Sequence, residues 1–169
     1  MKTNATHLEI LAAKHFGFRQ NLIVPNVSFG FDLSYEADLI VVRPSRRAIE
    51  IEIKVSIYDL RADLKKKKFQ YPSRFHQFYY LIPQEMEKYK DEILNIINPN
   101  AGLMISKSKI RMHDNGYASN FKFIEIIRPA KINKNARKIS DKEYLKLCEL
   151  AAMRIWTLKE ANNKKLACK

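Results

Sequence analysis

The chain has 169 residues, of which 46% are apolar and 29% charged, with only 4 glycines and 6 prolines. This composition predicts one folded domain with a sizeable core and excludes collagen-like and low-complexity chains. No apolar run approaches the ~20 residues that span a bilayer, no signal-peptide pattern opens the chain, and the two cysteines are too few for a disulfide framework. We therefore expect a cytoplasmic protein, of a bacterium or of a phage in its host, without membrane contact.

The net charge of +13 is concentrated in the second part of the chain. Residues 101–169 hold 16 basic and 6 acidic side chains, whereas residues 1–100 hold 15 and 12. Such a basic region favours a polyanionic partner, above all a nucleic acid. A soluble, lysine-rich protein with no such partner would carry the same excess.

Hydrophobic periodicity and turn residues predict helices and strands in alternation. In chain order we expect a helix over Thr6–His15, strands over Leu22–Phe29, Ala37–Val42 and Ala48–Val55, a helix from Ser56 to about Phe69, a strand over Phe78–Ile82, a helix over Glu85–Ile97, strands over Gly102–Ser106, Ile110–His113 and Phe121–Arg128, and a helix over Asp141–Ala161. This order is that of an α/β domain with a mixed sheet flanked by helices.

Several residues predict where these elements begin and end. Thr6 and Ser56 are expected N-caps, each with an acidic residue three positions on, and Ser140 is expected to cap the last helix. Gly17 is expected to end the first helix, and Pro25 suggests either an edge position or a bend for the first strand. The last helix is expected to pack through Tyr144, Leu147, Cys148, Ala151, Ile155 and Leu158, with Trp156 as a further packing residue.

The strand over Ala48–Val55 has the clearest pattern of all. Isoleucines alternate with Glu50, Glu52 and Lys54, so the three charged side chains share one face of the strand. One interpretation is the solvated face of an amphipathic strand, and the other is a functional site. Asp38 favours the second, because a carboxylate at the start of the preceding apolar strand is costly unless it is paired or binds a metal.

The two strands are expected to form a hairpin across the basic turn that joins them, which would bring Asp38 near the Glu52 end of its neighbour. The two carboxylates and the backbone carbonyl of Ile53 would then form a hard-oxygen site suited to Mg²⁺ or Mn²⁺. Glu50 is interpreted as a second metal ligand, as an acid just outside the site, or as a structural charge. Lys54, next to two acids, is expected to stay protonated.

The placement of Asp38, Glu52 and Lys54 resembles the signature of the PD-(D/E)XK nuclease superfamily, also called restriction-endonuclease-like. That signature is an acid at the start of one strand and (Asp/Glu)-x-Lys on the next. Residues 6–82 also follow the αβββαβ order of the superfamily's core. Segments similar to the MmcB-type DNA-repair-related branch extend over roughly residues 5–158 and include Ile51-Glu52-Ile53-Lys54-Val55-Ser56, Phe78-Tyr79-Tyr80-Leu81-Ile82-Pro83 and Leu150-Ala151-Ala152-Met153-Arg154.

The resemblance implies one nuclease-like domain over residues 1–169, with a core of about 6–106 and a basic extension over 107–169. That extension would add a strand pair and the long last helix to the sheet and helices of the core. The resemblance also implies a Mg²⁺-dependent deoxyribonuclease, active in DNA repair, recombination or replication.

The same resemblance assigns roles to individual residues. Asp38, Glu52 and Lys54 would be catalytic. The favoured role for Lys54 is to orient water or stabilise charge on the phosphate, and the less favoured alternative is that of a neutral general base. Asp38 and Glu52 would bind the metal. Glu9 on the first helix would be either the acid that some superfamily members add to the metal site or an ordinary charge on the helix surface.

The helix that begins after Ser56 borders this expected site. Ser56, Asp59 and Asp63 are expected beside it, although Asp63 also suits an ion pair with the lysine at 66 or 67. The cations expected to contact nucleic acid are Arg61, Lys65, Lys66, Lys67, Lys68 and Arg74. A lysine run of this kind is otherwise a solvated helix face.

An alternative function is that of a nuclease-fold protein without turnover, which binds nucleic acid or serves as an accessory subunit of a DNA-processing complex. Its partner would be a second copy of the chain, a helicase or a repair protein. The sequence leaves open the choice of DNA or RNA, of single or double strands, and of endonuclease or exonuclease action.

Overall fold

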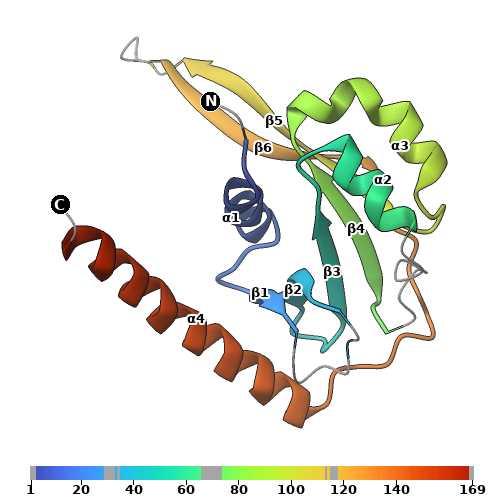
Figure 1. Cartoon of the computed structure of the whole chain (residues 1–169). Coiled ribbons are helices and arrows are strands. Elements are labelled where there is room, and N and C mark those ends of the chain that lie inside the picture. The colour runs from blue at the N-terminus through green and yellow to red at the C-terminus, as the bar shows by residue number, and fades with distance from the viewer. Residues whose placement is uncertain are drawn as a thin grey trace.

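The computed structural model describes residues 3–28, 33, 35–65, 74–112, 114 and 118–167, and of Lys65 and residues 164–167 it describes the backbone alone. The elements in chain order are α1 (Ala5–His15), β1 (Leu22–Val27), β2 (Ala37–Val42), β3 (Ala48–Ile53), α2 (Ile57–Lys65), β4 (Gln77–Ile82), the 3₁₀ helix η2 (Gln84–Tyr89), α3 (Lys90–Ile96), β5 (Gly102–Met112), β6 (Ala118–Arg128) and α4 (Asp141–Ala167). This is the expected α/β architecture of a mixed sheet flanked by helices (Figure 1).

The six described strands form one sheet in the order β1-β2-β3-β4-β5-β6. The pairs β1–β2, β2–β3 and β5–β6 are antiparallel, whereas β3–β4 and β4–β5 are parallel. The hairpin expected between the second and third strands is confirmed, with Leu39 opposite Ile51. Of the two interpretations of Pro25, the edge position is confirmed, because β1 is an edge strand of this sheet.

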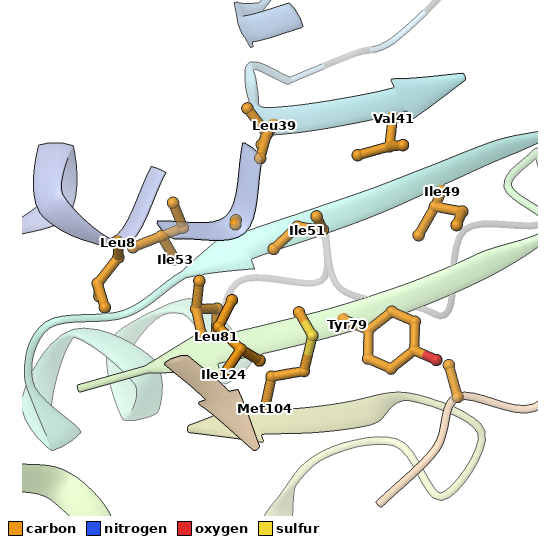
Figure 2. Packing of buried hydrophobic residues seen from close by; sticks show 12 residues of the cluster. Leu8, Leu39, Val41, Ile49, Ile51, Ile53, Tyr79, Leu81, Met104 and Ile124 are labelled. Atoms are coloured by element: carbon orange, nitrogen blue, oxygen red, sulfur yellow. The ribbon is translucent and has the colours of Figure 1, made fainter. Parts of the chain in front are cut away.

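One face of the sheet is covered by α1. Leu8 and Ala12 pack onto alternate residues of the central strands, a layer that Figure 2 shows in close-up. The buried strand and loop residues of this layer are Leu39, Val41, Ile49, Ile51, Ile53, Tyr79, Leu81, Met104, Ile124 and Ala130. Because side chains alternate along a strand, Glu50 and Glu52 point to the opposite face.

The opposite face is covered by α2, η2 and α3 over β4 and β5, and by the start of α4 over β1 and β2. Leu60 of α2 and Ile93 of α3 are fully buried in one cluster with Tyr80. Leu147 of α4 is fully buried in a second cluster with Ile40. The charged row of β3 therefore lies between two apolar clusters.

Helix ends follow the local hydrogen-bond chemistry. The predicted cap at Thr6 is wrong, because α1 begins one residue earlier and the side chain of Asn4 accepts the His7 N–H at 2.9 Å. Gly17, with φ of +70°, follows the C-cap residue Phe16 and confirms the predicted end of the helix.

The other two predicted caps are confirmed. The Ser56 hydroxyl accepts the Asp59 N–H at 3.1 Å, and the Ser140 hydroxyl accepts the Glu143 N–H at 3.3 Å. The Glu143 carboxylate accepts the Ser140 N–H at 3.0 Å in return, which completes a capping box.

The C-terminal part differs from the sequence expectation in two ways. β5 is one strand of 11 residues, where two separate strands were predicted. The expected packing of Ile155, Trp156 and Leu158 is wrong, because these side chains are 55–64% exposed. The reason is geometric: α4 packs against the edge of the sheet at β1 and then extends past it (Figure 1).

No helix in the described ranges combines the length and the apolar character that crossing a membrane requires.

Candidate active site

The antiparallel pairing of β2 and β3 determines where the first two acids meet. Ile40 lies opposite Glu50 and Leu39 opposite Ile51, so the same register, continued by one residue, sets Asp38 across from Glu52. Both side chains belong to the sheet face turned away from α1. The register therefore places Asp38 near the Glu52 end of β3, as the sequence predicted.

Two hydrogen bonds hold the acids and the lysine in place. The Ile53 backbone N–H donates to Asp38 Oδ2 at 2.7 Å, and Lys54 Nζ donates to Glu52 Oε1 at 2.7 Å. Lys54 Nζ also donates to Asp63 Oδ2, which ties α2 to the end of β3. Asp38, Glu52 and Lys54 thus form one cluster, with Asp63 as a further acid.

The charged row of β3 and its continuation at Lys54 are buried, whereas Asp38 and Asp63 are partly buried. Glu50 is 0% exposed, and Glu52 and Lys54 are each 5% exposed. The interpretation of this row as the solvated face of an amphipathic strand is therefore wrong. Burial of charged groups is costly unless they are paired or bound to a cation, so each of them needs a partner in the fold.

The acids compete with one another for protons. Burial, followed by the charge of Asp38, raises the pKa of Glu52 to about 7, against the opposing effect of Lys54. Burial also raises the pKa of Asp38, although the Ile53 N–H and the Lys54 ammonium oppose the rise. Both carboxylates would be easier to ionise with a cation between them.

Lys54 responds in the opposite direction. Burial by itself would lower the pKa of its ammonium, but the charge of Glu52 and the hydrogen bonds to Asp63 and Glu52 outweigh that effect and raise it. Lys54 is thus a fixed cation at every physiological pH, as the sequence predicted.

Glu50 has a partner of its own. Tyr35 Oη donates to Glu50 Oε2 at 2.9 Å, and burial, together with the charges of Glu52 and Asp38, raises the pKa of Glu50 well above its usual value. Tyr35 could not be selected from the sequence. It precedes β2, and outside a strand no alternation of side chains indicates its direction. Tyr80 also adjoins the acids, since its backbone pairs with Glu52 and their charges, after burial, raise its pKa.

Glu9 on α1 is linked to the site through its charge. It is partly buried, and burial and the charge of Asp38 raise its pKa, so it lies within electrostatic reach of that carboxylate. Ile53 contributes its N–H to Asp38, and a role for its carbonyl stays a prediction. Within the described ranges, no three His, Cys, Asp or Glu side chains form a ready-made metal cage. The arrangement is instead a pair of carboxylates with further acids nearby.

The residues of α2 divide into two groups. Ser56 caps the helix, and Asp59 is exposed but still acts on the pKa of Asp38 and Lys54 through its charge. Asp63 faces the site through Lys54. Of the three expected site-adjacent residues, Asp63 contacts the cluster and Asp59 acts on it through its charge, whereas a site role for Ser56 stays a prediction.

The expected phosphate-binding cations are mostly engaged or outside the described residues. Arg61 pairs with Glu92 at 2.6 Å, and Arg74 pairs with the capping-box residue Glu143. Lys65 ends α2, and Lys66, Lys67 and Lys68 lie outside the described residues. The role of this lysine run therefore stays a prediction.

The chain is similar to a solved structure described as the SPO1766 protein of unknown function from Silicibacter pomeroyi, with a TM-score of 0.59 and 16% sequence identity over 95% of this chain and 92% of that chain. At this identity the likeness shows the fold alone. No protein-family model and no curated protein sequence matches the chain.

Proposed function

We propose that the protein is a metal-dependent nuclease that hydrolyses DNA phosphodiester bonds, in repair, recombination or replication. The observation that carries this proposal is the cluster of buried Glu52 and Lys54 with partly buried Asp38, contributed by two neighbouring strands and linked through the Ile53 N–H. The element order α1-β1-β2-β3-α2-β4 is the αβββαβ order of the PD-(D/E)XK superfamily that the sequence resembles, which supports the same proposal.

The donor atoms suit a hard divalent cation. Glu52 Oε2 is buried and has no hydrogen-bond partner among the described residues, and its carboxylate faces the charge of Asp38. A cation held by Asp38 and Glu52 would give Glu52 Oε2 a partner and neutralise the repulsion between the two carboxylates. Mg²⁺ is commonly bound by one or two carboxylates, with water and substrate phosphate completing its shell, so a larger cage is not required. Glu9 and the Ile53 carbonyl are further proposed ligands.

Such an ion, when bound, polarises a phosphate oxygen and lowers the pKa of its water. The chain's own contribution is electrostatic. Lys54 is a permanent cation held by Glu52 and Asp63, so it is suited to stabilise negative charge on the phosphoryl group and unsuited to accept a proton. Because the cluster is already assembled, little reorganisation is needed when charge develops.

The direct test is cleavage of end-labelled single-stranded, duplex and branched DNA with Mg²⁺ or Mn²⁺. We expect products that disappear with EDTA and fall at least 1000-fold, an order of magnitude typical for loss of a main electrostatic group, in Glu52→Gln. The matched control is Glu36→Gln, an exposed glutamate two residues before Asp38, which should cleave normally. Cleavage that survives both EDTA and Glu52→Gln would refute the site.

A second candidate is a nucleic-acid-binding protein without turnover, acting in a complex. The observation that favours it is the net charge of +10 in residues 101–169, which does not depend on the carboxylate cluster. If the protein contacts about six phosphates of duplex DNA, the logarithm of its association constant should fall with the logarithm of the salt concentration at a slope near −5. Binding with that slope, with no cleavage of any DNA under either metal, would favour this candidate.

A further inference from the structure

Two strands extend beyond the rest of the sheet. The last β4–β5 pair joins Ile82 to Ile105, so from Lys107 onward β5 pairs with β6 alone. We call the described part of this projection, residues 107–112 and 118–123, the β5–β6 arm. Figure 1 shows it projecting to the upper left, away from α2 and α3.

The arm leaves the sheet at the edge where the candidate site lies. β3, β4 and β5 are parallel, and Ile53, Leu81 and Met104 form one row across them. Lys107 is three residues past that row, about 10 Å at the rise of a strand, and the arm continues in the direction in which β3 runs toward Lys54. Its base is two strands from β3, about 10 Å to the side.

One side of the arm combines cations with aromatic rings. The register pairs Lys109 with Phe121 and Arg111 with Ser119, and strand alternation puts Phe123 on the same side. The rings of Phe121 and Phe123 are stacked, with centroids 6.1 Å apart and planes at 12°, and Lys109 Nζ lies 5.4 Å from the Phe123 centroid. We call Lys109, Arg111, Phe121 and Phe123 the cation–aromatic face.

This face is on the same side of the sheet as the acids. Glu52 pairs with Tyr80 and Tyr80 with Leu103, and alternation along β5 carries that side from Leu103 to Lys109 and Arg111. Phe121 is 47% exposed. No ion pair joins Lys109 or Arg111 to a residue that the structure describes, whereas Lys107 is paired with Glu87 and Glu125 and is left out of the face.

We propose that the cation–aromatic face of the β5–β6 arm binds a single-stranded segment of nucleic acid and directs it to the carboxylate site. Unpaired bases stack on aromatic rings whatever their identity, and adjacent cations bind the phosphates between them. A duplex hides its base faces and would use the cations alone. The guiding role depends on the proposed function, whereas strand binding by the arm does not.

The test is binding of a fluorescein-labelled 20-nucleotide oligothymidylate in EDTA, measured by anisotropy with the Glu52→Gln protein so that no strand is cut. Phe121→Ala with Phe123→Ala should weaken binding at least tenfold, and Lys109→Gln with Arg111→Gln should make the salt slope less steep by about 1.4. Phe121→Leu with Phe123→Leu keeps apolar bulk on the arm, removes the rings and should weaken binding equally. A duplex of equal length should bind with no dependence on the rings.

The control lies on the opposite side of the same strand. Ile110 and Met112 are 74% and 67% exposed, and Ile110→Ala with Met112→Ala should leave strand binding unchanged. Unaltered binding in both phenylalanine variants, or loss only in the Ile110/Met112 variant, would overturn the proposal. Ring-dependent binding in a protein that never cleaves DNA would uphold the arm's role and refute the nuclease instead.

Discussion

Lys54 donates a 2.7 Å hydrogen bond to Glu52, two residues before it, and each residue is only 5% exposed. The same ammonium reaches Asp63 on α2. One lysine therefore joins the central sheet to the helix that covers it and compensates two acids that would otherwise be buried together.

Removal of this lysine should destabilise the fold. Lys54→Met leaves Glu52 and Asp63 without their cation, and breaking a buried pair from one side costs about 3–5 kcal/mol. Urea unfolding at pH 8 should show a loss in this range. At pH 5 the loss should be smaller, because Glu52, whose pKa is about 7, is then protonated. Lys146→Met, which removes an exposed pair with Glu149, should change the free energy of unfolding by less than about 1 kcal/mol; equal costs for the two variants would contradict the buried-pair account.

Divalent ions should stabilise the protein in a pH-dependent way. The pKa of Glu52 is raised from 4.5 to about 7 in the folded state, so metal-free stability falls as the pH rises between these values. The full effect of this one group is about 3 kcal/mol. Mg²⁺ competes with the proton on Glu52, so it should bind more tightly at pH 8 than at pH 5.5. We expect 10 mM Mg²⁺, a concentration on the order of the Kd of a weak site, to raise Tm at pH 8 and to have little effect on Tm at pH 5.5.

Calorimetry with and without Mg²⁺ at the two pH values measures this. Glu52→Gln should abolish the Mg²⁺-dependent rise in Tm, whereas Glu36→Gln should keep it. An equal Tm rise at both pH values, or one that persists in Glu52→Gln, would place any metal elsewhere.

Glu50 should behave as a structural residue. It is fully buried, it accepts from Tyr35, and its raised pKa keeps it protonated over a wider pH range than usual. Glu50→Gln should thus change the free energy of unfolding by less than about 1 kcal/mol and leave Mg²⁺-dependent cleavage intact, whereas Tyr35→Phe should cost about 1–3 kcal/mol. A folded Glu50→Gln protein without cleavage would instead make Glu50 a metal ligand.

The two parts of α4 should differ in their effect on stability. Leu147 is fully buried, and Leu158 is 63% exposed. Leu147→Ala should cost about 2–5 kcal/mol in urea unfolding, and Leu158→Ala should change stability by less than about 0.5 kcal/mol. Comparable losses would mean that the distal part of the helix is covered in solution, for example by a second copy of the chain.

Much of the strand structure follows from local pattern alone. The alternation of isoleucines with Glu50, Glu52 and Lys54 predicts both the strand and the shared side of its charged residues. The hairpin with the preceding strand follows from the short basic turn, and with it the proximity of Asp38 and Glu52. These predictions succeed because strand periodicity and hairpin register are properties of neighbouring residues.

The sequence by itself therefore determined which acids and which lysine share one side of a hairpin. Only the tertiary structure decided that this side is buried and that Asp63 and Tyr35 form hydrogen bonds with Lys54 and Glu50. It also decided that α4 extends past the sheet and that β5 and β6 project from it as an arm. The physical reason is that burial and side-chain partners depend on elements far apart in the chain. A helix or strand carries the same periodicity whether or not another element lies against it.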